Sequence, residues 1–171
     1  MVAMTTAEDL VVATQRVRES AQAVGAALSS VAVYTEPAIA RAVQAEQNLY
    51  TRIENEFGML TSTEAGTRMG SRSRAPRNLA ATAHRDHALV AVRRGNSLVY
   101  PGFQFGPDGQ PLEVIGRLRA TAEANEWSEA GLVQWLCSPT TYFHGDRPVD
   151  HLIEDPERVV EVAADALAVS W

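Results

Sequence analysis

The stretch that decides the fold covers residues 60–84 and reads LTSTEAGTRMGSRSRAPRNLAATAH. Thr61 followed by Glu64 matches a capping box, in which each side chain accepts a hydrogen bond from the backbone N–H of the other residue. A helix is therefore predicted to begin at Thr61. Gly70 supplies its stop, because glycine readily adopts the left-handed backbone that ends helices. The first of two short helices is thus expected to run through Met69.

A second helix is predicted after a turn at residues 71–74. Pro76 suits the first turn of that helix, where its missing N–H costs nothing, and the helix continues to about His84. Two short helices joined by a tight, glycine-containing turn are typical of a helix-turn-helix. Arginine and asparagine are well suited to hydrogen-bond guanine and adenine edges in the major groove. On or just before the second helix, the candidate DNA-reading residues are Arg72, Arg74, Arg77, Asn78 and Thr82.

A β-hairpin is expected next. The apolar run from Ala88 to Arg93 is typical of a strand, Gly95-Asn96 forms a turn, and Ser97–Tyr100 returns as the second strand. Such a hairpin corresponds to the wing of a winged helix. Arg93 and Arg94 would then lie near its tip and contact the DNA backbone or minor groove.

Residues 60–105 resemble the excisionase-like or MerR-like winged helix-turn-helix. The motifs that carry the resemblance are LT-x-x-E-A at 60–65 and AVRRG at 91–95 followed by YP-x-FQF at 100–105. The run SRSRAP at 71–76 departs from the residues that ordinarily begin a recognition helix. Two interpretations therefore stay open: a winged helix that binds DNA, or one that serves only as a scaffold.

The distribution of charge favours DNA contact more than the net charge does. The chain carries −6 overall, and all 15 of its basic residues are arginine. Seven of them lie between Gly58 and Gly106, where Glu64 and Asp86 are the only acids. This window carries +5 and leaves −11 for the rest of the chain. A basic patch on an acidic protein is typical of a phosphate-binding surface, although it would also suit a solvated face.

Residues 1–58 are predicted to form two helices. Thr5 and Glu8 form another capping box, and a heptad stripe of mostly apolar residues runs from Leu10 to Val31. Pro37 begins the second helix, which ends at Gly58. Each helix has one narrow apolar stripe, which must pack against another helix to be buried. The helices would pack as an antiparallel hairpin within the monomer or against a second copy in a homodimer, which suits a two-fold symmetric DNA site.

Residues 107–171 are predicted to be helical. One helix covers Leu112–Asn125, and Ser128 caps a second that ends before Pro139. A turn-rich stretch follows, and Asp155-Pro156 begins a closing helix rich in valine and alanine.

This C-terminal third resembles the toxin-binding domain of Xre/MbcA/ParS antitoxins, whose pattern is WL-x-x-P…LGG-x-x-P-x-x-LL before a closing helix. The matching residues are Trp127-Ser128, Trp135-Leu136, Pro139, Gly145, Arg147-Pro148-Val149-Asp150 and Leu152. The chain departs from the pattern at Phe143, where the family has leucine, and at His144, where it has the first glycine.

The resemblance implies an antitoxin of a type II toxin–antitoxin system. Such proteins bind RES-domain toxins, which consume NAD, and many repress their own operon through a helix-turn-helix. The implied toxin contacts are His144, Gly145, Arg147, Pro148 and Trp171. Trp171 would be a large apolar anchor, or it would pack on its own last helix. The alternative function is a stand-alone transcription regulator whose C-terminal domain senses a ligand or dimerises.

The sequence lacks the residues that a metal site, a phosphate-binding loop or an enzyme active site would need. Four histidines and one cysteine do not supply a structural zinc site, and no glycine-rich phosphate loop is present. Cys137 follows Trp135-Leu136 on an apolar face and is interpreted as a buried thiol. No enzyme activity, metal or cofactor is expected. No apolar run is long enough for a membrane span, so a cytoplasmic location is expected.

The sequence as a whole predicts a mainly α-helical protein in three sections. These are a helical hairpin at 1–58, a winged helix-turn-helix with a small β-hairpin at 59–106, and a helical, toxin-binding-like domain at 107–171.

Overall fold

The computed structural model describes residues 37–168. The chain divides into two compact units, residues 1–43 and 44–171. The capping box and heptad stripe predicted before Pro37 lie outside the described residues, as does Trp171. Helix α2 covers Pro37–Phe57 and stops at Gly58, whose φ of 80° is the left-handed value expected of a glycine that ends a helix.

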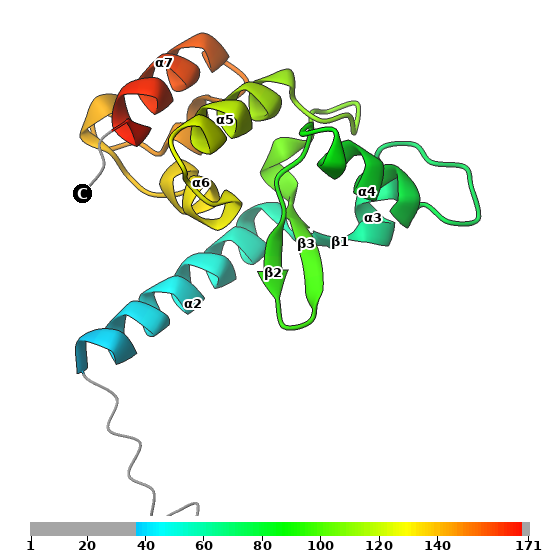
Figure 1. The fold of residues 1–171 in the computed structure, drawn as a ribbon, viewed down its shortest axis with the longest axis horizontal. Helices are drawn as coiled ribbons and strands as arrows, with labels where there is room; N and C mark the ends of the chain where they lie inside the picture. The colour runs from blue at the N-terminus through cyan, green and yellow to red at the C-terminus, as the bar shows by residue number, and fades with distance from the viewer. Residues whose placement is uncertain (1–36, 169–171) are drawn as a thin grey trace, which may run out of the picture. The chain divides into compact units, whose positions relative to one another are not determined.

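The second unit is mainly helical with a small antiparallel sheet, which confirms the predicted fold class (Figure 1). After α2 its elements are β1 (Met59–Thr61), α3 (Ser62–Arg68), α4 (Arg77–Arg85), β2 (Val92–Arg94), β3 (Ser97–Pro101), α5 (Glu113–Ala124), α6 (Glu129–Leu136) and α7 (Pro156–Leu167). Short 3₁₀ turns lie at Gly102–Gln104, Thr141–Phe143 and Pro148–His151. Within residues 37–168, no helix combines the length and apolar character needed to cross a bilayer.

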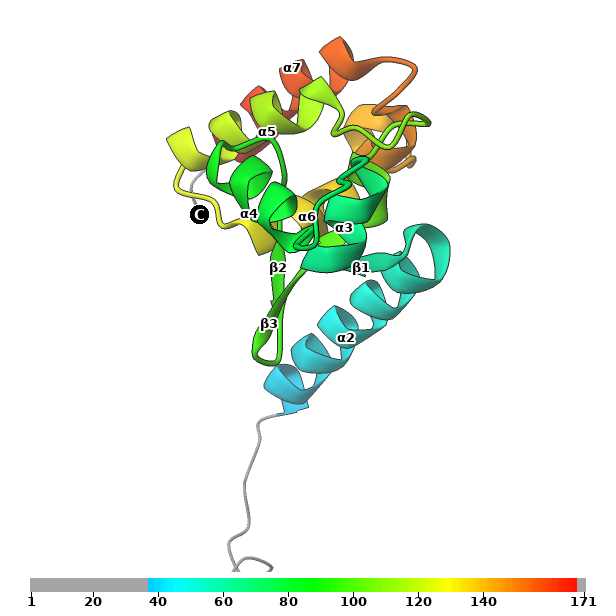
Figure 2. The same ribbon diagram turned by 90° about the vertical axis from the view of Figure 1, so that its right-hand side faces the viewer.

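Helices α3 and α4 begin where the sequence predicts, but their connection is longer than the expected tight turn. The backbone N–H of Thr61 donates to the Glu64 carboxylate at 2.7 Å, and the Glu64 N–H donates to the Thr61 hydroxyl at 3.3 Å. The connection covers Met69 to Pro76. A Cβ on Gly66 would collide with the backbone carbonyl of Pro76. Gly66 is therefore the residue that lets α3 and α4 approach closely (Figure 2).

The sheet differs from the predicted hairpin in two ways. It has three strands in the order β1-β3-β2, because Met59–Thr61 pairs antiparallel with β3 (Figure 2). In addition, β2 begins at Val92 rather than at Ala88. The buried side chain of Gln104 accepts from Val90 N at 2.8 Å and donates to Val90 O at 3.0 Å. The Gln104 side chain thus provides the hydrogen bonds that a neighbouring strand would otherwise provide to the backbone of Val90.

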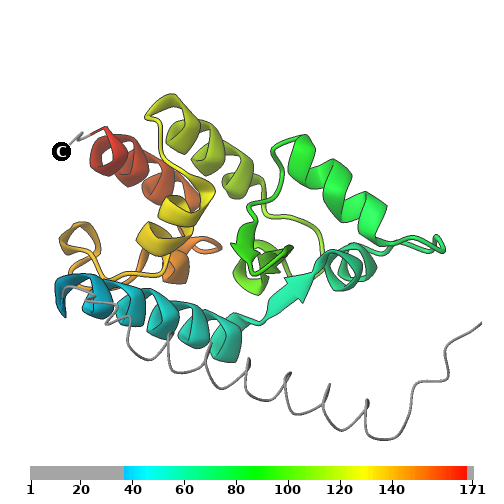
Figure 3. The ribbon, with the colours of Figure 1, turned by 60° about the horizontal axis from the view of Figure 1, so that its bottom comes forward.

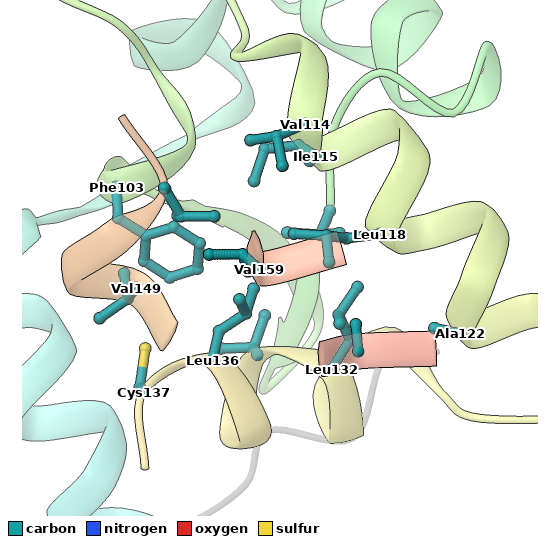
Figure 4. Close-up of a cluster of buried hydrophobic side chains, with 14 of the residues drawn as sticks. Phe103, Val114, Ile115, Leu118, Ala122, Leu132, Leu136, Cys137, Val149 and Val159 are labelled. Carbon is teal, nitrogen blue, oxygen red and sulfur yellow. The ribbon is translucent and has the colours of Figure 1, made fainter. Parts of the chain in front are cut away.

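Two apolar clusters hold the second unit together. The smaller lies between α3, α4 and the sheet and includes Ala65, Ala80 and Tyr100. The larger joins α5, α6 and α7 to residues of α2 and β2 (Figure 4). Figure 3 shows α5 and α7 running beside one another. Because Ile53 and Val92 bury their side chains in the larger cluster, it draws residues from all three sections of the sequence.

The C-terminal helices start at the predicted caps. Ser128 accepts from Gly131 N at 3.0 Å, and Asp155 accepts from Arg158 N at 3.2 Å. These side chains satisfy N–H groups that have no partner within their helix.

Candidate nucleic-acid interface

The arginines predicted to contact DNA are exposed. Arg72 and Arg74 lie in the connection between α3 and α4, and Arg77 and Asn78 form the first turn of α4. None of these three arginines forms an ion pair with another residue of the part 37–168. Their guanidinium groups are therefore available to an outside anion.

A shallow groove of about 400 Å³ lies beside this surface. Its walls come from the start of α3, the start of α4 and the start of β3, and its lining residues are Thr61, Ser62, Thr63, Arg77, Ser97 and Leu98. Serine and threonine hydroxyl groups and the Arg77 guanidinium lie in this groove together with apolar atoms, and such donors can contact a phosphate or sugar backbone. The groove also places the N-terminal end of α4 next to the hairpin.

The two arginines of the hairpin, which the sequence groups together, point to opposite faces of the sheet. Successive strand residues alternate in direction. Arg93 pairs across the strands with Leu98, which lines the groove beside α4. Arg94 lies on the other face, with its guanidinium carbon 4.8 Å from the centre of the Tyr50 ring of α2. Arg93 therefore lies on the same side as the basic surface around α4, whereas Arg94 has a partner in α2.

A buried polar network behind α4 was not found from the sequence. Arg119 on α5 is 7% exposed, and its Nη1 donates to the carbonyls of His84 and Leu89 at 2.6 Å each. Its Nη2 pairs with the Glu129 carboxylate of α6 at 2.9 Å. In the sequence, the one signal for a buried arginine is that Arg119 follows the apolar residues Ile115 and Leu118.

Glu129 completes this network. Its carboxylate contacts His84 Nε2 at 2.9 Å and accepts from Ala91 N at 2.6 Å. Glu123 joins at the edge, 2.9 Å from His87 Nδ1 and 3.1 Å from Arg119 Nε. Desolvation raises the pKa of the Glu123 carboxyl, but the hydrogen bonds and charges of Arg119 and His87 together outweigh it, so the pKa is lowered. The network ties the last turn of α4 and the segment before β2 to α5 and α6.

Four of the five residues predicted to bind a toxin lie between α6 and α7, whereas Trp171 is outside the described residues. His144 has φ 58° and Gly145 has φ 103°, so both occupy the left-handed region. A positive φ is uncommon for histidine, whereas glycine adopts it readily. His144 and Gly145 are exposed, whereas Pro148 is buried.

Arg147 is engaged inside the protein. Its guanidinium donates to both carboxylate oxygens of Glu56 at 2.7 Å and also to Asp150. It lies 5.7 Å from the Phe57 ring centre. The paired guanidinium lowers the pKa of both carboxyls, and these partners raise the pKa of Arg147. The contacts give Arg147 a structural role that the sequence did not reveal.

The cysteine of this chain is buried, as the sequence predicts. Burial raises the pKa of the Cys137 thiol to about 12, so at neutral pH the group is an unreactive thiol. Within residues 37–168, no three side chains of histidine, cysteine, aspartate or glutamate converge as metal ligands do.

No protein-family model matches this sequence, and no curated protein does. Among solved structures, the chain is similar to the NMR structure of Rv2175c, with a TM-score of 0.57 and 22% sequence identity. The similarity covers 66% of this chain and 82% of that chain. At this level of identity the likeness concerns the fold alone.

Proposed function

We propose that this protein binds double-stranded DNA through α4 and the β2–β3 hairpin. The observation that carries the proposal is the set of exposed arginines without an acidic partner among residues 37–168: Arg72, Arg74, Arg77 and Arg93. They gather around a helix that follows a capped first helix and precedes a hairpin. In such modules the second helix enters the major groove and the wing contacts the backbone.

The measurement is the affinity of the full chain for duplex DNA as a function of salt. Each phosphate contact contributes about 0.9 to the slope of log affinity against log salt. The double variant Arg74→Ala, Arg77→Ala is expected to weaken binding and to reduce that slope by roughly two. The matched control is Arg117→Ala, Arg158→Ala. It also removes two exposed arginines, but these are paired with Glu157 and Glu161 on the C-terminal helices.

Equal losses in the two double variants would mean that binding follows overall charge and that α4 is not the contact surface. Absence of salt-dependent binding by the unaltered chain would leave the winged helix as a scaffold.

The second proposed function is that of an antitoxin that neutralises a RES-domain toxin, with DNA binding serving to repress its own operon. The exposed loop at His144 and Gly145 supports this proposal, because both residues have left-handed backbone at the place where the resembling sequence pattern has two glycines. Tyr142 and Ile153 nearby in the sequence are 45% and 65% exposed, and exposed apolar side chains suit a protein partner. The proposal places the protein in the cytoplasm, as a homodimer on a two-fold symmetric operator.

Co-expression with the product of the neighbouring reading frame tests this function. Deleting the loop and α7 is unsuitable, because Phe143, Val149 and Val159 belong to the larger core. Point substitutions are preferable: the exposed pair Tyr142→Ser with His144→Asp, and separately Trp171→Ser, the anchor predicted from the sequence. The expected result is growth rescue by the unaltered chain and its loss in at least one of the variants. A harmless neighbour that forms no complex would instead favour a stand-alone regulator.

A further inference from the structure

The outward side of α4 forms one continuous stripe. Five exposed residues follow one another at helical spacing, namely Arg77, Asn78, Ala81, Thr82 and Arg85. At 3.6 residues per turn they share less than half of the helix circumference, and Arg85 falls in the middle of that arc. Leu79 flanks the stripe and is 38% exposed, whereas Ala80 on the opposite side is buried. A groove of DNA that received α4 would therefore meet Arg85 as well as its first turn.

The Arg85 side chain is restrained by a hydrogen bond to an uncharged group, so its positive charge is not neutralised by that contact. Its Nη2 donates to the Thr82 hydroxyl at 3.0 Å, one helical turn earlier. Among residues 37–168 it forms no ion pair, and four of its five N–H donors have no hydrogen-bond partner there. A hydrogen bond that restrains a long side chain lowers the entropy lost when that side chain binds.

The surroundings of Arg85 favour a contact with a DNA base edge over a contact with a phosphate. Arg85 ends α4, where the helix dipole is negative, and the exposed Asp86 follows as its cap residue. A phosphate approaching this end would meet both negative groups. Guanine O6 and N7 carry only partial negative charge and are therefore repelled less than a phosphate. Backbone contacts have a better location at the other end of α4, where Arg77 lies beside the hairpin groove.

We infer that Arg85 reads a guanine in the major groove, at the end of the recognised site that lies away from the hairpin. This inference rests on the proposed DNA binding. From Arg77 to Arg85 the helix rises about 12 Å, which corresponds to roughly three to four base pairs. The guanine is accordingly expected that far from the position nearest Arg77.

The experiment selects bound duplexes from a random DNA pool with the full-length chain, and then with Arg85→Ala and Arg93→Ala. For Arg85→Ala we expect the preference for guanine at one position to fall by about ten-fold, within the usual range for one bidentate contact. Affinity for unselected DNA and the salt slope stay nearly unchanged. For Arg93→Ala, a backbone contact, we expect weaker binding to every sequence and a slope lower by about one.

Arg85 is exposed, so its removal is not expected to unfold the chain, and thermal unfolding of each variant checks this. Uniform weakening with a reduced salt slope in Arg85→Ala would show a phosphate contact and overturn the inference while leaving DNA binding intact. An unchanged sequence preference would overturn it as well. If the unaltered chain retains no DNA, the proposed function itself fails.

Discussion

Arginines in the two halves of this protein have different surroundings. Around α4, Arg72, Arg74 and Arg77 are exposed and form no ion pair with another residue of the part 37–168. In the C-terminal half, Arg119 and Arg147 each contact two carboxylates and are largely or partly buried. The difference shows that the surroundings of an arginine, more than its presence, separate a binding surface from a structural ion pair. Five variants can break or sharpen this comparison.

Replacing Arg119 by methionine is expected to have the largest effect on stability. It leaves two carbonyls and the Glu129 carboxylate short of a donor in a buried place, which typically costs about 3 kcal/mol of the free energy of unfolding. Urea denaturation measures the loss. The control is Arg117→Met on the exposed side of the same helix, where a surface ion pair contributes less than about 1 kcal/mol. Equal losses in the two variants would remove the structural role assigned to Arg119.

Replacing Arg147 by alanine should cost less, about 1–2 kcal/mol, because its three partners are partly exposed and water replaces some of the lost contacts. The midpoint of thermal unfolding is the measurement. In the same samples, toxin binding would separate the structural role from the predicted contact role. Tight toxin binding by a stably folded Arg147→Ala protein would argue against the contact role.

Glu56→Gln should change how stability depends on pH. The Glu56 carboxyl has a folded pKa below its ordinary value of 4.5 because Arg147 donates to it. Its contribution is therefore present above the unfolded pKa and is lost as pH falls through the folded pKa. Between pH 7 and pH 3 the unaltered chain should lose more stability than Glu56→Gln, as judged by urea midpoints. Parallel curves would mean that this ion pair contributes nothing measurable.

The smallest effects are expected in the hairpin. Arg94→Ala removes a cation–π contact with Tyr50 and should lower stability by about 0.5–1 kcal/mol with little change in DNA affinity. Arg93→Ala should do the reverse, because Arg93 has no aromatic partner among residues 37–168 and lies on the face beside α4. Unfolding and DNA titration of both proteins provide the comparison. Equal DNA losses would mean that both arginines contact the backbone.

Much of the helical framework could be predicted because its signals are local. Thr61, Ser128 and Asp155 cap their helices as expected, since a cap involves residues only three positions apart. The strand predicted at Ala88–Arg93 was too long for a non-local reason. Gln104, far along the chain, satisfies the backbone of Val90, and no periodicity in the sequence reports that contact.

The candidate site was predicted in the same uneven way. The sequence indicated that Arg72, Arg74, Arg77, Asn78 and Arg93 belong to one basic surface, because exposure follows from the helix and turn pattern. It could not assign different roles to Arg93 and Arg94. Their side chains point to opposite faces of the sheet, and only the tertiary structure shows which helix covers each face. Nor did it include Arg85, whose place in the α4 stripe depends on which side of the helix is buried.

The sequence by itself determined where the helices of residues 37–168 begin, that the fold is mainly helical, and that basic charge concentrates between Gly58 and Gly106. Caps and turns depend on a few neighbouring residues, and composition is read directly from the sequence, so none of them requires a structure. Only the tertiary structure decided which arginines are paired. Glu56 and Arg147, or Glu129 and His84, meet across long stretches of chain, and packing alone brings them within hydrogen-bond distance.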